Sequence, residues 1–120
     1  MKTHRDLDVW KRSFYLVKEV YRMTEKFPRH ELFGLTSQLR RASVSVPVNI
    51  SEGVARHGSR EFKHFLDISM GSLSELETSL MISEDLNYIK ESELTQKLND
   101  IKIITVQLKH LQAAILKRDS

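Results

Sequence analysis

Apolar residues recur every three or four positions along most of the chain, which is the spacing of one face of an α-helix. Four stretches carry this pattern and predict helices over approximately residues 6–27, 34–57, 59–87 and 92–117. Connections as short as those between the stretches place consecutive helices side by side in opposite directions. The pattern therefore predicts a single all-α domain over residues 1–120, an antiparallel up-down-up-down four-helix bundle.

Prolines and capping residues mark where these helices begin, end or bend. Pro28 ends the first helix, because the residue before a proline is driven out of the α region. Ser59 and Ser92 are expected to cap the third and fourth helices. Pro47 lies inside the second helix, where it removes a backbone hydrogen bond and clashes with the carbonyl of Ser43, at a cost of about 3 kcal/mol. Because the apolar spacing continues beyond Pro47, we expect a kink rather than a break into two helices.

The first two helices carry more apolar surface than a bundle helix needs. The first has a main stripe of Leu7, Trp10, Phe14, Val17 and Tyr21. A second apolar stripe lies roughly 120° away on the same helix, whereas an arc of about 100° or slightly more is enough to face a core. One wide buried face would account for this, but monomers rarely expose patches of this size, and we favour packing against other copies of the chain. The predicted oligomer interface consists of Val9, Leu16, Val20, Met23, Val44, Val48, Ile50 and Val54.

Composition removes several classes of protein from consideration. The 120 residues include no cysteine, which excludes disulfides, thiolate nucleophiles, zinc fingers and iron–sulfur ligation. No apolar run approaches the roughly 20 residues needed to span a bilayer. The first residues also lack the apolar segment of a secretory signal. We therefore expect a cytoplasmic protein.

Basic residues are concentrated in the first half of the chain. Residues 1–64 hold 13 Lys and Arg against 7 Asp and Glu, whereas residues 65–120 hold 6 against 9. Clustered basic side chains bind phosphate backbones in a salt-sensitive manner that ignores base sequence. The alternatives are a solvated face or pairing with acidic patches of a protein. The predicted nucleic-acid-binding residues are Arg12 and Arg22 on the first helix, Arg40 and Arg41 on the second, and Arg56, Arg60 and Lys63 near the junction of the second and third.

Catalytic and metal-binding patterns are weak in this sequence. Glu61 and His64 match the Glu-x-x-His motif of di-iron bundles, but such sites need a second motif and two further inward glutamates. The other histidines lack ligand spacing, and there is no Gly-rich phosphate loop. We therefore predict a protein that is not an enzyme and that has no metal site and no other cofactor.

Glu75 is the unusual acidic residue of the third helix. Helical geometry places it among apolar positions and predicts that it faces inward, where a carboxylate must be paired or hydrogen-bonded. Arg40 or Arg41 and the hydroxyls of Ser72 and Ser79 are candidate partners. We favour a structural role over a functional one, in a polar network made of Asn49, Glu52, Ser72 and Glu75.

Several motifs in order resemble a known family. They are Asp6-Leu7-Asp8-Val9-Trp10-Lys11, Phe27-Pro28-x-x-Glu31-Leu32-Phe33-Gly34-Leu35, Gln38-Leu39-Arg40-Arg41-Ala42, Ser45-Val46-Pro47-x-Asn49-Ile50-Ser51-Glu52-Gly53, Glu61-Phe62-x-x-Phe65-Leu66 and Gly71-Ser72-Leu73-x-Glu75-Leu76-Glu77-Thr78. The chain is similar to the four-helix-bundle proteins encoded in intervening sequences of 23S rRNA genes, which are related to the accessory protein of diversity-generating retroelements.

The resemblance implies a four-helix bundle that assembles into a ring, typically a pentamer. The retroelement relative binds nucleic acid through a basic surface and works beside a reverse transcriptase, which makes RNA, DNA and such an enzyme the expected partners. The family signature residues carried over are Arg40, Arg41, Asn49, Glu52, Gly53, Ser72 and Glu75. Most of them are expected to be structural, with Gly53 allowing close helix approach and Asn49 bonding near the proline kink.

Two functions are consistent with these patterns. The first is a non-enzymatic, ring-forming accessory protein that binds RNA or DNA without sequence specificity through a basic surface. The second is a protein-interaction scaffold with no nucleic-acid binding. Undetectable binding to RNA and DNA at low salt would favour the scaffold.

Overall fold

The computed structural model describes residues 3–118 and confirms an all-α four-helix bundle. Its long helices are α1 (Asp8–Thr24), α2 (Leu35–Val54), α3 (Ser59–Asp85) and α4 (Glu91–Arg118). Two short 3-10 helices, η1 (His4–Asp6) and η2 (Arg29–Glu31), precede α1 and α2. The described residues contain no strand. Helices α3 and α4 match their predicted ranges to within two residues, whereas α1 and α2 each end three residues early, so α1 ends at Thr24 and not directly before Pro28.

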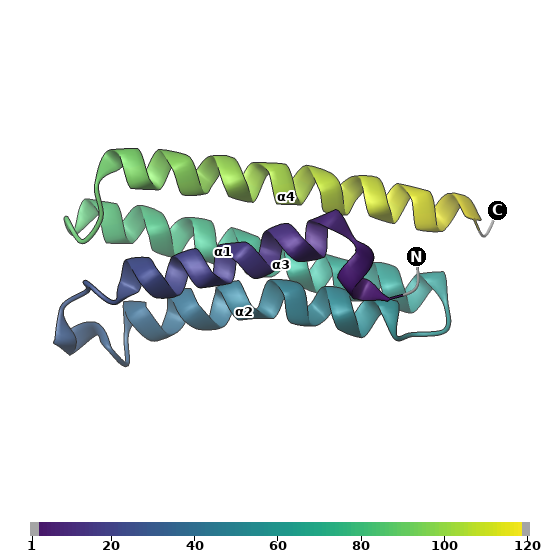
Figure 1. Cartoon of the computed structure of the whole chain (residues 1–120), viewed down its shortest axis with the longest axis horizontal. Coiled ribbons are helices and arrows are strands. Elements are labelled where there is room, and N and C mark those ends of the chain that lie inside the picture. The colour runs from purple at the N-terminus through teal and green to yellow at the C-terminus, as the bar shows by residue number, and fades with distance from the viewer. Residues whose placement is uncertain (1–2, 119–120) are drawn as a thin grey trace.

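The four helices lie side by side along the long axis of a 49 × 23 × 20 Å molecule, and Figure 1 shows the chain reversing direction at each connection. Packing is most extensive between α2 and α3, and α1 packs well on α2. The contact between α1 and α4 is much smaller. The bundle is therefore least closed along the seam between its first and last helices.

The core is formed by aliphatic side chains from all four helices. Its fully buried members include Leu16 and Val20 of α1, Leu39, Val46 and Ile50 of α2, Leu66, Leu73, Leu76 and Leu80 of α3, and Ile104 and Leu108 of α4. Burying a side chain of this size contributes about 1.5–3 kcal/mol. The core therefore supplies the main force that holds the helices together.

The core contradicts most of the predicted oligomer interface. Of the residues assigned to that interface, Val9, Leu16, Val20, Met23 and Ile50 are buried within the chain's own core. The aromatic stripe of α1 is the one at the surface, with Phe14 49% and Tyr21 41% exposed. The period of a helix reveals two stripes, but only the neighbouring helices decide which of them is covered.

Pro47 lies within one continuous helix, so α2 does not break in two. Local hydrogen bonds accompany the proline: Asn49 Nδ2 donates to the carbonyl of Ser45 at 2.8 Å, and Ser51 Oγ donates to the carbonyl of Pro47 at 3.0 Å. From α3, Ser69 Oγ donates to the carbonyl of Val46 at 2.9 Å. These bonds confirm that Asn49 bonds near the proline, whereas the kink itself stays a prediction.

The two predicted serine caps are wrong. Gly58 stands at the cap position of α3, and Ser59 is the first residue of that helix. Helix α4 begins at Glu91, so Ser92 already lies in its first turn. The carboxylate of Glu93 accepts a hydrogen bond from the backbone N–H of Lys90 at 3.0 Å. At the start of α4, Glu93 therefore accepts a hydrogen bond from a backbone N–H that has no partner within the helix. Ser92 was expected to fill this capping role.

A hydrogen-bonded cluster joins the α1–α2 connection to the α3–α4 connection. Glu31 accepts hydrogen bonds from the backbone N–H of Leu35 at 3.2 Å and from Tyr88 Oη at 2.9 Å. These two bonds, the backbone one first, hold the pKa of the Glu31 carboxyl below its usual range. Asn87, with φ at 66°, ends α3 in the left-handed conformation and turns the chain so that Tyr88 reaches Glu31.

Gly53 confirms the expectation of a close approach between α2 and α3. A Cβ atom added to Gly53 would lie 2.8 Å from Cδ1 of Phe62 and 3.2 Å from Cβ of Phe65. Phe62 is buried and cannot withdraw into solvent. The position therefore accepts no side chain without a shift of one helix against the other.

We expect Gly53→Ala to destabilise the protein. Overpacking of a filled site typically costs about 1–3 kcal/mol, which exceeds the roughly 0.5–1 kcal/mol that alanine gains over glycine within a helix. The free energy of unfolding in urea measures the change. Gly71→Ala is the matched control, because its added Cβ meets no atom within 4 Å, and it should be neutral or stabilising. Equal stability of the two variants would contradict the close approach.

Candidate nucleic-acid interface

The basic residues at the junction of α2 and α3 are partly neutralised. Arg56 forms an ion pair with Glu52 at 3.0 Å, and its guanidinium lies 4.9 Å from the ring centre of Phe65. Lys63 forms an ion pair with Asp67 at 3.1 Å. Arg60 is exposed and pairs with no carboxylate of the described residues. This junction cluster (Arg56, Arg60 and Lys63) therefore offers a phosphate less free charge than its composition suggests.

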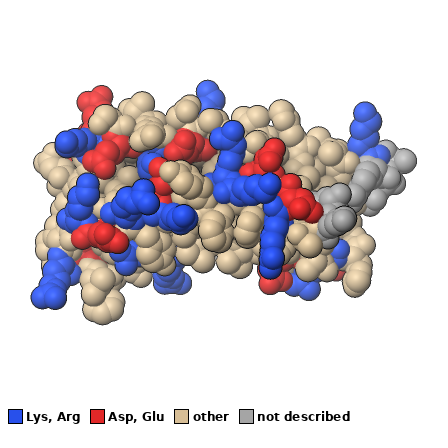
Figure 2. Space-filling model, in the orientation of Figure 1, with Lys and Arg blue, Asp and Glu red and all other residues tan. Residues whose placement is uncertain are grey.

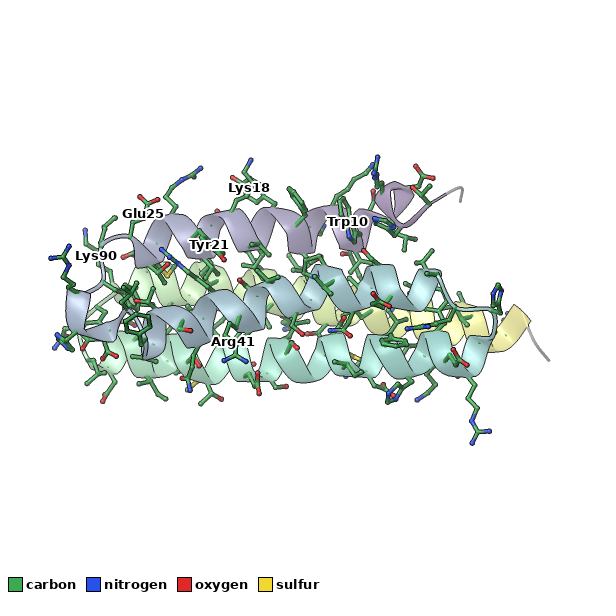
Figure 3. The ribbon with its side chains drawn as sticks, turned by 90° about the horizontal axis from the view of Figure 1, so that it is seen from below. Trp10, Lys18, Tyr21, Glu25, Arg41 and Lys90 are labelled. Carbon is green, nitrogen blue, oxygen red and sulfur yellow. The ribbon has the colours of Figure 1, made fainter. Side chains whose placement is uncertain are left out.

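The two adjacent arginines of α2 have different environments. Arg40 Nε donates to Thr24 Oγ1 at 2.9 Å, and its guanidinium lies 4.6 Å from the ring centre of Tyr21. Arg40 thereby connects α2 to the end of α1. Arg41 is exposed over the line where α2 meets α3 (Figure 3) and helps to line a groove of 780 Å³ there. The two side chains thus belong to different surfaces.

The largest set of unpaired basic side chains lies along α1. Five exposed residues form this α1 basic stripe: Lys11, Arg12, Lys18 and Arg22 on α1, and Lys26 in the turn that follows the helix. None of them forms an ion pair with a carboxylate within the described residues. Figure 2 shows Lys and Arg side chains along the middle of this face, where α1 runs, and Lys18 points away from the bundle in Figure 3.

On α1 the stripe extends over about 17 Å from Lys11 to Arg22, eleven residues at a rise of 1.5 Å each, and Lys26 follows in the turn after the helix. Arg12 and Arg22 were among the predicted binding residues, whereas Lys11 and Lys26 were not. The spacing of 11, 18, 22 and 26 at three- and four-residue multiples would have placed both lysines on the same outward face. Lys11, Lys18 and Arg22 therefore share the outward face of α1, and the exposed carboxylate of Glu25 lies between Arg22 and Lys26.

A groove separates α1 from α4, beside the α1 basic stripe. Lys97, a lysine of α4 with only 4% of its surface exposed, lines a smaller hollow of 150 Å³ further along this seam, together with Glu19, Arg22 and Lys26. Lys97 Nζ forms ion pairs with Glu19 at 3.2 Å and Asp100 at 3.7 Å. Sequence reasoning missed Lys97, because Leu94 and Leu98 were taken as the apolar face of this turn. Of these two ion pairs, the one with Glu19 links α4 to α1 across the seam, whereas the one with Asp100 lies within α4.

A second groove lies on the other side of α1, against α2, and it is almost entirely apolar. This α1–α2 apolar groove has a volume of 240 Å³ and is lined by Trp10, Phe14, Val17, Lys18, Val44, Pro47, Val48 and Ser51. Trp10 Nε1 donates to Ser51 Oγ at 3.1 Å, which holds the indole across the two helices. In Figure 3, Trp10 and Tyr21 lie on the side of α1 that faces α2. Val44 and Val48, both predicted for the oligomer interface, line this groove, whereas Val54 packs half-buried against the core.

The predicted polar network exists only in part. Ser72 Oγ donates to Ser45 Oγ at 2.7 Å, and Asn49 Nδ2 lies 3.0 Å from the same hydroxyl, so Asn49 and Ser72 meet through Ser45. Glu52 instead pairs with Arg56 at the surface. Glu75 is exposed, which contradicts its predicted inward position. It sits about 100° around α3 from the buried Leu76 and lines the α2–α3 groove together with Arg41 and Ser79.

The Glu-x-x-His motif of α3 lies at the surface of the bundle. Glu61 and His64 are both exposed. No group of three or more His, Asp or Glu side chains gathers to hold a metal ion in the described part of the chain. Among the described helices, none combines the length and the apolar character needed to cross a bilayer.

Comparison with known proteins identifies the family. No curated protein matches this chain. The family model described as 23S rRNA-intervening sequence protein matches residues 5–110, which include all of α1, α2 and α3 and most of α4. The match agrees with the bundle architecture described above, and the chain belongs to the 23S rRNA-intervening sequence protein family.

Proposed function

We propose that this protein is a non-enzymatic accessory protein that binds RNA or DNA through its phosphates, without sequence specificity. The observation that carries the proposal is the α1 basic stripe, whose five side chains are exposed and unpaired with any described carboxylate. Exposed basic side chains in a row release counterions when they meet a polyanion, and this release drives binding. Binding by the junction cluster and by Arg41 stays a prediction.

We also propose that the protein works as a homo-oligomer formed through the α1–α2 apolar groove. Phe14 and Val48, both 49% exposed in the single chain, lie in this groove and would be covered by a second copy. A ring, with five copies as the resemblance implies, repeats the α1 basic stripe on every copy. Linked stripes bind one strand far more tightly than a single stripe does, because later contacts become intramolecular.

The salt dependence of binding by the unmodified protein tests this proposal. Fluorescence anisotropy with labelled 20-nucleotide RNA and DNA of several unrelated sequences measures the affinity between 20 and 200 mM salt. If all five stripe residues of one copy contact phosphates, log K should fall against log salt with a slope of about −3.5 for single strands. The sequences should differ little. Undetectable binding at the lowest salt would overturn the proposal and support the protein-interaction scaffold.

A further inference from the structure

We infer that the nucleic acid is single-stranded: its phosphates follow the α1 basic stripe, and an unpaired base enters the α1–α4 groove and stacks on Tyr15. This inference rests on the proposed function and adds the class of strand that the surface accepts. Three features of the groove carry it, namely a free aromatic ring, a hollow with apolar and polar walls, and an uneven distribution of charge.

Tyr15 is the free aromatic ring of α1. It lies on the outward side of the helix between Lys11 and Lys18, and 54% of its surface is exposed. The rings of Trp10 and Phe14 pack on each other at 5.1 Å, and the ring of Tyr21 carries the guanidinium of Arg40. Among the aromatic residues of α1, Tyr15 alone has no such ring or cation–π contact with a described residue. An exposed ring within a basic stripe is the platform on which unpaired bases stack.

The hollow beside Tyr15 has the chemistry that a base requires. It has a volume of 420 Å³, and its inner wall is formed by the buried apolar residues Leu16 and Ile104. The amide of Gln96 and the carboxylate of Asp100 line the side toward α4. Apolar surface accommodates the faces of a base, and amide and carboxylate groups form hydrogen bonds with its edge.

The charges of the groove favour one strand over two. The wall from α1 carries Lys11 and Arg12, whereas the wall from α4 carries Asp100, and Glu93 lies further along the seam. Glu19 and Asp100 line the hollow and share the single ammonium of Lys97, which lies in the neighbouring hollow, so these two carboxylates keep a net negative charge. The second phosphate backbone of a duplex would face these carboxylates, and paired bases would not reach Tyr15. A single strand can place its phosphates along the α1 basic stripe and turn an unpaired base toward Tyr15 and the hollow beside it.

Three kinds of ligand separate base stacking from phosphate binding. These are 20-nucleotide single strands of RNA and of DNA without self-complementarity, the corresponding blunt duplexes, and a DNA backbone of the same length without bases. We expect the protein to bind the single strands about tenfold more tightly than the abasic backbone, and Tyr15→Ala to lose about tenfold for the single strands alone. Tyr15→Phe should keep the affinity. Phe33→Ala, which removes a 93% exposed aromatic outside the stripe, should leave all affinities unchanged.

The outcomes distinguish this inference from the proposed function. Equal binding of single strand, duplex and abasic backbone, or a Tyr15→Ala variant that binds single strands as tightly as the unmodified protein, would overturn the stacking of a base while leaving phosphate binding intact. Failure to bind any of the ligands at low salt would overturn both. A preference for single strands with either sugar supports the inference, and the tighter of the RNA and DNA strands then identifies the ligand.

Discussion

Replacing Lys18, Arg22 and Lys26 together by glutamine should weaken binding to single-stranded RNA about 100-fold at 0.1 M salt. Each phosphate contact contributes about 0.7 to the slope of log K against log salt for a single strand, so three lost contacts reduce the slope by about 2. At 0.1 M salt this corresponds to about two decades of affinity, or about 2.7 kcal/mol. All three side chains are exposed, Lys18 and Arg22 on α1 and Lys26 in the turn after it, and glutamine is a good helix former, so the fold should persist.

The matched control removes the same number of charges elsewhere. Replacing Arg56, Arg60 and Lys63 by glutamine leaves the α1 basic stripe intact and deletes two side chains that already pair with Glu52 and Asp67. Anisotropy titrations of both triple variants over the same salt series should show a much smaller loss for the junction variant. The opposite ranking would assign the phosphate contacts to the junction cluster and contradict the assignment to α1.

Val48→Glu should convert the oligomer into single chains of 14.0 kDa at micromolar concentration. Val48 lies in the α1–α2 apolar groove and is 49% exposed in the single chain, so a carboxylate there remains solvated in the monomer. In the oligomer the same carboxylate is buried without a partner, which costs several kcal/mol. Because each 1.4 kcal/mol weakens association tenfold, the loss is about 100-fold or more.

Light scattering coupled to size-exclusion chromatography measures this change in mass. Val106→Glu is the matched control, since Val106 is 43% exposed on α4 and does not line the groove. That variant should keep the mass of the unmodified protein. A Val48→Glu variant that elutes with the unmodified oligomer would move the interface to another surface. An unmodified protein that already scatters as a 14.0 kDa particle would end the oligomer proposal.

The two variants also separate charge from valency. Val48→Glu should weaken nucleic-acid binding through the loss of linked stripes, while each single chain keeps its own salt dependence. The triple glutamine variant should keep the mass of the oligomer, and the slope of log K against log salt should be smaller by about 2.

Much of the candidate site was within reach of sequence reasoning, because the charges of α1 lie at helical spacing on a helix whose existence was clear. Lys97 could not be predicted from the sequence. A lysine between Leu94 and Leu98 gives no sign that it is buried near Glu19, which is far away in sequence. The prediction that Glu75 faces inward was wrong for a related reason. Glu75 is exposed beside the groove between α2 and α3, and the placement of the neighbouring helices, not the spacing within α3, decides that this position faces solvent.

The sequence by itself determined the number of helices, their approximate limits and the family, because helical periodicity and the family motifs are both present in the order of residues along the chain. Only the tertiary structure decided which of the two apolar stripes of α1 is buried and which basic residues remain unpaired. Both depend on side chains that reach a residue from other helices, and a pattern along one helix contains no information about those neighbours.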